Sequence, residues 1–279
     1  MRILILLLFP LFSYSQLSIG ILESSRKFVG DSTAPKAFII AANITNATQI
    51  SAIYSLAFGL QQDGLWTKMK AIYPMVGGSA SSHKYNLKDP RDLDAAFRLL
   101  FVGGWTHSST GATPNGTSGY AITYLNPSTS LTISSAHFSK YNRTNDLAGN
   151  KIDGIFDGLT SFFQQNYSAG NGIIGDIGTI GSYTQTDTRG LFTSTRTAAN
   201  VYKVFKNSTQ VATNTSTNTT IPNYNFWIGA RNNANSALFY NTYECAFASI
   251  GDGLTDTDAA NFYTRVQAYQ TSLSRQINP

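Results

Sequence analysis

Cysteine is almost absent from this sequence of 279 residues, in which Cys245 is the single example. One cysteine cannot form a disulfide within the chain, so the fold has no cross-link of that kind. Cys245 lies in the apolar run 243–250, and this setting predicts a small, buried, hydrophobic side chain. The alternative is a disulfide to a second chain.

Charged residues are scarce as well, because they make up only 13% of the chain. Gly, Ser, Thr and Asn are abundant instead, a composition typical of extracellular β proteins with polar, uncharged turns. The formal net charge is +5, but no run of Lys or Arg is longer than two residues. The sequence therefore does not predict a nucleic-acid-binding surface.

Glutamate occurs only at Glu23 and Glu244, and this shortage bears on catalysis. Glycosidases need two carboxylates beside the bond that is cleaved. Glu244 has no acidic neighbour on its predicted strand, and the close aspartate pairs lie in predicted turns or at a helix start. Metal-ligand spacing is missing among His83, His107 and His137, and no phosphate-binding or dinucleotide motif occurs. We expect a protein without enzymatic activity.

The N-terminus combines one positive charge, an apolar run over residues 3–12 and small residues up to Ser15. This pattern is typical of a secretory signal peptide, so residues 1–15 predict an exported chain. The apolar run is shorter than the roughly 20 residues of a membrane-spanning helix. The alternative is a retained hydrophobic segment that touches a membrane or a partner protein. Residues 16–30 are a connector.

Residues 31–80 predict a small helical segment. Asn46 is in position to cap a helix over residues 47–62, in which apolar side chains recur at helical spacing. Residues 69–73 are predicted to form a further short turn of helix. Such short helices are not stable alone, so we expect them to pack on the sandwich described next or on a neighbouring protein.

From residue 85 onward, short apolar runs alternate with Gly, Asn and Asp turn signals. Residues 131–133 and 136–141 are predicted strands, residues 153–154 a turn, and residues 201–212 a hairpin. Many short strands without a tandem repeat predict an antiparallel β-sandwich of the jelly-roll type over residues 85–279.

The closing segment, residues 225–273, shows the clearest pattern. Residues 226–228 predict a strand that ends at Gly229. Residues 243–250 alternate, which places Cys245 and Phe247 on one face of a second strand. Thr255 and Asp258 then form a variant of the capping box, which predicts the start of a C-terminal helix.

This segment resembles the end of laminin-G-like, concanavalin A-like lectin and glucanase domains through residues 228–229, 246–250 and 254–259. Residues 105–126, with the motifs W-T-H-S and P-N-G-T-S-G-Y-A, also resemble segments of bacteriophage virion and tail-associated proteins. The resemblance implies a mainly β, concanavalin A-like sandwich. The small helical segment precedes this sandwich, and a short C-terminal helix closes it.

Loop side chains that suit a sugar are the candidate ligand-binding residues. Proteins hold sugars with aromatic faces and with polar side chains carried on loops. The candidates here are Trp105, His107, Tyr141, Arg143, Arg231, Asn232 and Asn233. For each aromatic side chain, packing in the core is the alternative interpretation.

The resemblance suggests one cofactor, calcium, because several laminin-G and lectin domains bind it through loop aspartates. The candidate ligands are Asp146, Asp153, Asp187 and Asp252. Their spacing specifies no calcium motif, so the sequence leaves open whether calcium binds.

These features favour a non-enzymatic virion surface protein, a spike, fibre or decoration component, on the virion surface or secreted. We expect its lectin-like sandwich to bind a host cell-surface glycan or receptor. We also expect it to form a homo-oligomer beside other virion proteins, with any membrane contact confined to the N-terminal segment. Two alternatives stay open: a purely structural virion protein and a secreted bacterial adhesin. Fold alone does not decide between them.

Overall fold

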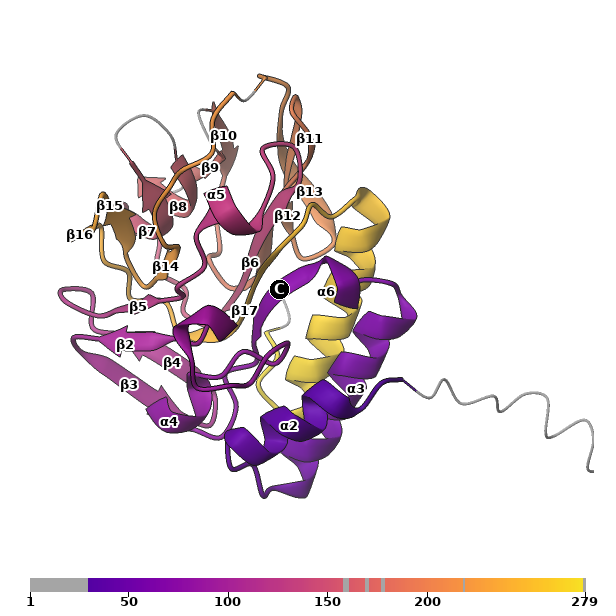
Figure 1. Ribbon diagram of the computed structural model, residues 1–279. Helices are drawn as coiled ribbons and strands as arrows, with labels where there is room; N and C mark the ends of the chain where they lie inside the picture. Colours follow the sequence, from indigo (N-terminus) through magenta and orange to yellow (C-terminus); the bar gives the residue numbers. More distant parts are fainter. Residues whose placement is uncertain (1–29, 158–160, 169–170, 177–178, 218, 278–279) are drawn as a thin grey trace, which may run out of the picture.

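The computed structural model of the protein describes residues 30–157, 161–168, 171–176, 179–217 and 219–277. Two β-sheets lie face to face, and helices cover the outer side of one of them (Figure 1). The predicted mainly β sandwich with a C-terminal helix is confirmed. The predicted signal segment 1–15 lies outside the described residues, and no helix within them is long and apolar enough to cross a bilayer.

The first sheet has the strand order β13-β12-β11-β6-β17-β4-β3, and β1 pairs with β17 beside this path. Its pairs are antiparallel, as predicted. Its strands are β1 (Met69–Tyr73), β3 (Trp105–Ser108), β4 (Gly111–Pro114), β6 (Ala136–Asn142), β11 (Gly190–Ala198), β12 (Val201–Lys206), β13 (Thr209–Asn214) and β17 (Cys245–Gly251).

The second sheet has the order β10-β9-β8-β7-β14-β5-β2, extended by β15 and β16. It is mixed, because β15 runs parallel to β7 while the other pairs are antiparallel. Its strands are β2 (Leu100–Val102), β5 (Tyr120–Ile122), β7 (Lys151–Phe156), β8 (Ser161–Ser168), β9 (Asn171–Asp176), β10 (Thr179–Thr184), β14 (Trp227–Ile228), β15 (Arg231–Asn233) and β16 (Ser236–Leu238).

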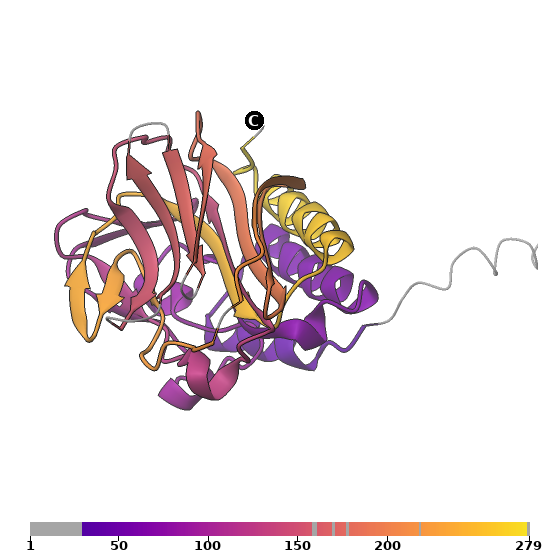
Figure 2. The same cartoon turned by 90° about the horizontal axis from the view of Figure 1, so that it is seen from above.

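Helices α2 (Thr33–Ala41), α3 (Ala47–Gln62) and α6 (Asp256–Ser272) form a third layer on the first sheet (Figure 2). Apolar side chains of α3 and α6, among them Leu56, Phe262 and Val266, share one core with Tyr141 and Phe247 of the sheet. The helices are α2 (Thr33–Ala41), α3 (Ala47–Gln62), α4 (Ala80–His83), α5 (Pro127–Ser130) and α6 (Asp256–Ser272), with short 3-10 turns at η1 (Trp66–Lys68) and η2 (Asp94–Ala96).

Local sequence signals placed the ends of the two long helices. Asn46 caps α3, since its side chain accepts a hydrogen bond from the backbone N–H of Gln49 at 3.1 Å. At α6 the capping box forms in both directions between Thr255 and Asp258. Both helix predictions are confirmed, because capping depends only on residues within one turn.

A second core fills the space between the sheets. Phe138 and Ile250 contribute from the first sheet, and Ile155 and Ile228 contribute from the second. This core also encloses one ion pair, in which Nζ of Lys140 lies 2.9 Å from a carboxylate oxygen of Asp153. The sandwich therefore has apolar packing on both sides of the first sheet.

Three predicted elements are wrong. Residues 69–73 form strand β1 instead of a helical turn, because β1 completes the pairing of β17 from Ala248 to Gly251. Residues 131–133 form no strand and make only an isolated bridge between Thr132 and Ser135. Residues 153–154, predicted as a turn, lie within strand β7. The hairpin over 201–212 is confirmed, with Asn207 in the left-handed conformation at its turn.

Strand β17 departs from the predicted alternation. The register of its pairing with β6 shifts between Cys245 and Phe247. Cys245 packs in the core between the sheets, whereas Phe247 packs under α6. The predicted common face is wrong, because one irregular residue reverses the sides to which the next side chains point. The predicted burial of Cys245 is confirmed, and that burial raises the pKa of its thiol to about 12.

Candidate ligand-binding face

A row of side chains crosses the solvent side of the second sheet. Residues that lie opposite each other in register point to the same side of a sheet. Across strands β2, β5, β14, β7, β15 and β16, one residue of each strand lies opposite one residue of the next. In that order the residues are Leu100, Ile122, Trp227, Gly154, Arg231 and Leu238. Their neighbours Ala121, Ile155 and Ile228 belong to the core between the sheets, so the row points outward.

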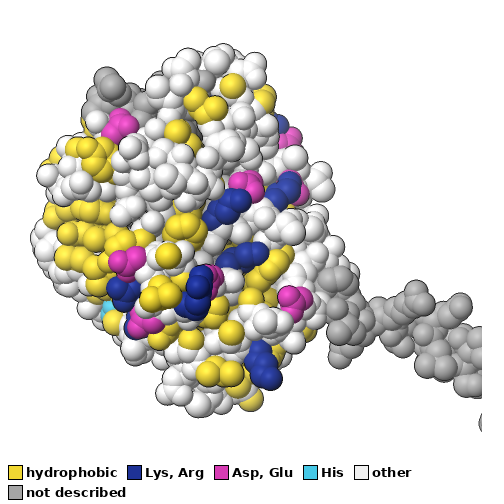
Figure 3. All heavy atoms as spheres, viewed as in Figure 1, with side chains coloured by type: hydrophobic (Ala, Val, Ile, Leu, Met, Phe, Trp, Pro, Cys, Tyr) yellow, Lys and Arg dark blue, Asp and Glu magenta, His cyan; other side chains and the backbone are white. Residues whose placement is uncertain are grey.

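We call this surface the aromatic face. It consists of Leu100, Tyr120, Ile122, Arg231, Leu238 and Phe239. Leu100, Leu238 and Phe239 are exposed by 38%, 42% and 36%, which places them among the exposed large hydrophobic side chains of the described residues. Hydrophobic side chains gather on the side of the molecule that carries β2, β5 and β16 (Figure 3). Contiguous exposed apolar surface of this kind marks interaction sites.

Two stacked aromatic side chains form a rigid base for the aromatic face. Tyr120 stacks on Trp227 with 4.3 Å between ring centroids and an interplanar angle of 19°. Trp227 is only 4% exposed, so Tyr120 is the member of the pair that a ligand can reach. Arg231 lies between Phe156 and Phe239, with its guanidinium carbon 4.9 Å and 4.5 Å from the two ring centroids.

The hairpin that presents Leu238 and Phe239 is held in a strained conformation. Ala234, Asn235 and Phe239 all have positive φ, at 49°, 69° and 55°. A bulky residue such as Phe239 rarely adopts this region, and such strain concentrates at functional sites. Asn232 supports the turn from below, since its side chain bonds to the backbone of Asn225 and Asn235.

Replacing Ala234 with glycine is expected to stabilise the protein by about 1 kcal/mol. The β-carbon of a left-handed alanine costs roughly 1–2 kcal/mol, more than the chain entropy that glycine adds to the unfolded state. Urea denaturation measures the change. Ala237→Gly, in the regular strand β16 of the same hairpin, is the control and should destabilise. Destabilisation by both variants would contradict the strain.

Trp105 and His107, two predicted ligand residues, are partly buried and make contacts within the protein. The indole Nε1 of Trp105 donates to the backbone oxygens of Val102 and Tyr120, each at 3.2 Å. The ring fills the space left by Gly229, where a β-carbon would lie 2.9 Å from it. Trp105 therefore packs against the edge of the core and supports the start of β5.

His107 pairs with His83 from α4. Their Nδ1 atoms lie 3.0 Å apart, and Nε2 of His83 accepts a hydrogen bond from the backbone N–H of Gly78. Neutral His83 therefore carries its proton on Nδ1 and donates it to His107. Burial, followed by the charges of His107 and Arg275, lowers the pKa of His83 to about 3. Burial lowers the pKa of His107 as well.

The other predicted ligand-binding residues lie in different parts of the structure. Tyr141 is fully buried under α6 and donates to the side chain of Gln267, so its predicted ligand contact is wrong. Asn232 is buried too and serves the turn described above. Arg143 pairs with Glu244 at 2.9 Å and donates to the backbone oxygen of Arg275, which gives it a structural partner. Of the predicted set, Arg231 belongs to the aromatic face, and Asn233 lies beside it and accepts a hydrogen bond from Arg231.

The four calcium candidates lie apart, each beside a cation. Asp153 contacts Lys140, Asp146 contacts Lys151, Asp187 contacts Arg189, and Asp252 contacts Lys70. Among the described residues, no three His, Cys, Asp or Glu side chains are grouped so that they could hold a metal ion. The arrangement gives a calcium site no support, because the carboxylates already have basic partners.

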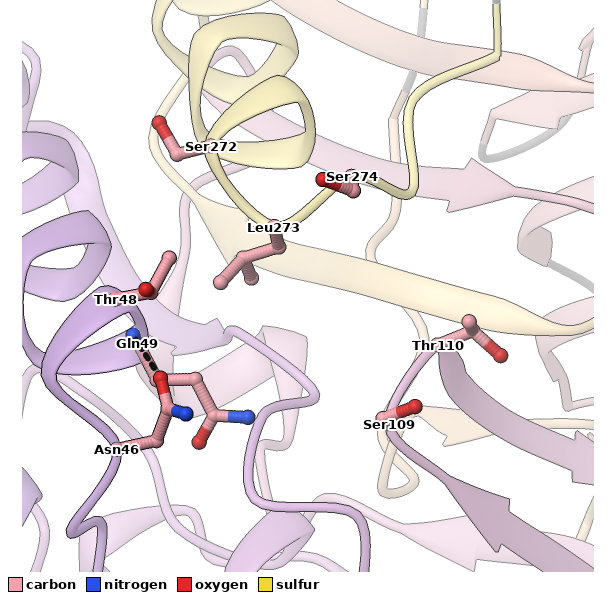
Figure 4. A pocket seen from close by; sticks show the side chains of 8 residues that line it. All are labelled: Asn46, Thr48, Gln49, Ser109, Thr110, Ser272, Leu273 and Ser274. Carbon is pink, nitrogen blue, oxygen red and sulfur yellow. Dashed lines mark hydrogen bonds between the residues drawn. The ribbon is translucent and has the colours of Figure 1, made fainter.

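Two hollows lie elsewhere on the molecule. One, of 340 Å³, has a polar wall made by the start of α3, the β3–β4 turn and the end of α6 (Figure 4). It is lined by Asn46, Thr48, Gln49, Ser109, Thr110, Ser272, Leu273 and Ser274, without an aromatic platform. The other, of 510 Å³, lies at the start of α2 beside Trp66 and Lys88. Neither contains a residue that the sequence predicted as a ligand contact.

Of the six residues of the aromatic face, sequence reasoning predicted only Arg231. Leu100, Tyr120 and Ile122 lie in strands of three residues, which are too short to show a period. Phe239 follows strand β16 and carries no motif. The available signal was the apolar pair Leu238–Phe239 in an otherwise polar loop, since such pairs in loops are unusual.

Comparisons with known proteins give remote structural similarities. No protein-family model and no curated protein matches the sequence. The binding domain of botulinum neurotoxin DC, solved in complex with rat synaptotagmin II, has a TM-score of 0.48 and 11% identity over 72% of this chain and 52% of that one. A mutant of Trypanosoma rangeli sialidase has a TM-score of 0.47 and 7% identity over 82% of this chain and 40% of that one.

Domain 4 of an extracellular arabinanase from Geobacillus stearothermophilus, solved in complex with arabinotriose, has a TM-score of 0.42. Its identity is 13%, over 70% of this chain and 98% of that one. The chain spans about half the length of the neurotoxin binding domains that it matches. At these levels of identity and superposition, the similarities say nothing about function.

Proposed function

We propose that this protein is a non-enzymatic binding protein that holds a host cell-surface glycan or receptor on its aromatic face. The observation that carries the proposal is the row of exposed apolar and aromatic side chains in register across the second sheet. Sugar rings have apolar C–H faces and hydroxyl edges. Tyr120, Phe239 and the two leucines suit the faces, while Arg231 and Asn233 can hydrogen-bond to the edges.

In this proposal the chain is displayed on a virion surface as a spike, fibre or decoration component, or it is secreted. The resemblance of residues 105–126 to segments of phage virion proteins supports that setting. The chain forms a homo-oligomer, because several copies of a shallow site raise the avidity for a surface that repeats its ligand.

A purely structural virion role is the second candidate. Leu100 and Leu238 favour it, since both are exposed and neither can hydrogen-bond to a sugar hydroxyl. In that case the aromatic face contacts a neighbouring virion protein, and the core of such an interface is apolar.

Binding of the full chain to a broad glycan array, in calcium and in EDTA, tests the proposal. We expect saturable binding to a subset of glycans that is equal in both buffers, because the candidate calcium ligands have basic partners. Binding lost in EDTA would require a metal site that the proposal lacks. If a folded chain binds no glycan and no host cell, the structural role replaces the proposal.

A further inference from the structure

Arg231 is a cation without an anionic partner. Its guanidinium contacts the rings of Phe156 and Phe239 and makes one hydrogen bond, from Nη2 to the side-chain oxygen of Asn233 at 3.1 Å. Several other basic side chains reach a carboxylate even near the surface, as Lys203 does with Asp256 and Arg265 does with Asp63. The aromatic face itself contains no acidic side chain.

This arrangement is unfavourable for the protein alone. The Nε atom of Arg231 is enclosed and has no hydrogen-bond acceptor. A buried donor without an acceptor destabilises the folded state, and a half-buried charge loses hydration. Burial lowers the pKa of Arg231 for the same reason, although a guanidinium stays charged at neutral pH. The two rings fix the plane of the guanidinium in advance of any ligand.

The place of Arg231 in the row brings it within reach of whatever lies on the face. It is opposite Leu238 in β16, and Leu238 and the adjacent Phe239 are exposed. On its other side it is opposite Gly154, which adds no side chain to the surface. A ligand that packs on Leu238 and Phe239 therefore meets the guanidinium.

We infer that Arg231 selects ligands that carry an anionic group, so that the aromatic face recognises acidic glycans, with a carboxylate or a sulfate on the sugar, in preference to neutral ones. The inference rests on the function proposed above and names its ligand class. A planar guanidinium matches a carboxylate or sulfate with two parallel N–H donors, and such charge-assisted bonds are about twice as strong as neutral ones. The net charge of +5 attracts the same ligands from a distance.

The test compares three forms of one oligosaccharide against the full-length protein by calorimetry: the carboxylate form, its carboxyl-reduced neutral form and a sulfated form. We expect an acidic form to bind about 10- to 100-fold more tightly than the reduced form, and the difference to shrink at high salt. The preferred acidic form identifies the anionic group. Equal binding of all three forms would overturn the inference and leave the proposed function intact. Absence of binding by every form, together with no binding to the glycan array or to host cells, would overturn both.

Variants test the residue itself. Arg231→Met should lose the preference for the acidic form, because the fold-loss in affinity is larger for the acidic form than for the reduced form. Arg231→Lys keeps the charge but not the planar fork, so it should retain part of the preference. Arg189→Met, which removes an arginine already paired with Asp187, is the matched control and should bind as the wild type does. A folded Arg231→Met protein that still prefers the acidic form would contradict the inference, and thermal unfolding confirms folding.

Discussion

Replacing Asp153 with alanine is expected to destabilise the protein by about 3–5 kcal/mol. The ion pair of Asp153 with Lys140 lies between the sheets, where the two side chains are 4% and 0% exposed. Asp153 also accepts hydrogen bonds from the backbone N–H of Gly229 at 2.6 Å and from the side chain of Asn241 at 2.9 Å. Without the carboxylate, a buried ammonium and two buried N–H groups lose their partner.

Equilibrium urea denaturation of wild type and variant measures this loss. Asp94→Ala is the control, because its pair with Arg98 lies on the surface and should contribute less than about 1 kcal/mol. The double variant Lys140→Met with Asp153→Leu should recover only part of the stability. Apolar side chains of similar size can replace a buried ion pair, but the N–H groups of Gly229 and Asn241 still lack their acceptor. Similar losses for Asp153→Ala and Asp94→Ala would contradict the account of the core.

Lowering the pH from 7 to 5 is expected to reduce the stability of the folded protein, and this is the second large effect. Burial is the main cause that lowers the pKa of His83 to about 3 and that of His137 to about 4, from an ordinary value near 6.5. The folded state therefore binds fewer protons than the unfolded state between these values. Stability is fully present above pH 6.5 and is lost as the pH falls through this window.

Burial keeps His137 neutral, and at His83 the hydrogen bonds also oppose a second proton. His137 is enclosed, and its two nitrogens contact the backbone oxygen of Asp252 and the hydroxyl of Ser249. A second proton on His83 would face the N–H of Gly78, and one on Nδ1 of His107 would face the proton of His83. Protonation of His83 and His137 in the unfolded state should together lower the free energy of unfolding by about 3 kcal/mol between pH 6.5 and pH 5. The slope for each approaches about 1.4 kcal/mol per pH unit only below pH 6.5.

Denaturation curves at pH 7, 6 and 5 test this prediction. The interval lies above the range in which aspartates titrate, so histidines dominate it. His137→Asn should reduce the slope of stability against pH by about 1.4 kcal/mol per unit. Stability that stays constant or rises between pH 7 and pH 5 would show that the buried imidazoles accept protons without penalty.

The parts of the fold that sequence could predict are those set by neighbouring residues. Asn46, Thr255 and Asp258 act within one helical turn, so α3 and α6 could be placed from the sequence. Strand β1 could not, because its identity depends on pairing with β17, which lies far along the chain. The irregular register at Cys245 is equally non-local, since it appears only in the pairing with β6.

The residues of the candidate ligand-binding face also divide into those that a local pattern predicts and those that only long-range pairing brings together. Arg231 and Asn233 were predicted because a polar loop after an aromatic strand is a common place for binding residues. Their neighbours on the face come from β5 and β2, which the register aligns across more than a hundred residues of sequence. Tyr141 looked similar to a loop aromatic until the structure placed it under α6. The ion pair between Lys140 and Asp153 could not be predicted either, because it joins two sheets and no local sequence pattern indicates it.

The claim that the aromatic face binds the ligand is tested most directly by comparing the binding isotherms of two double variants with that of the wild type. The first pair, Leu238→Ser with Phe239→Ala, removes exposed side chains of the aromatic face. The second, Ile40→Ser with Leu93→Ser, removes exposed side chains outside it. With the tightest glycan from the array, the account predicts a loss of about 100-fold or more for the first pair. The second pair should bind within about twofold of wild type. Equal affinities for both pairs would place the binding site elsewhere.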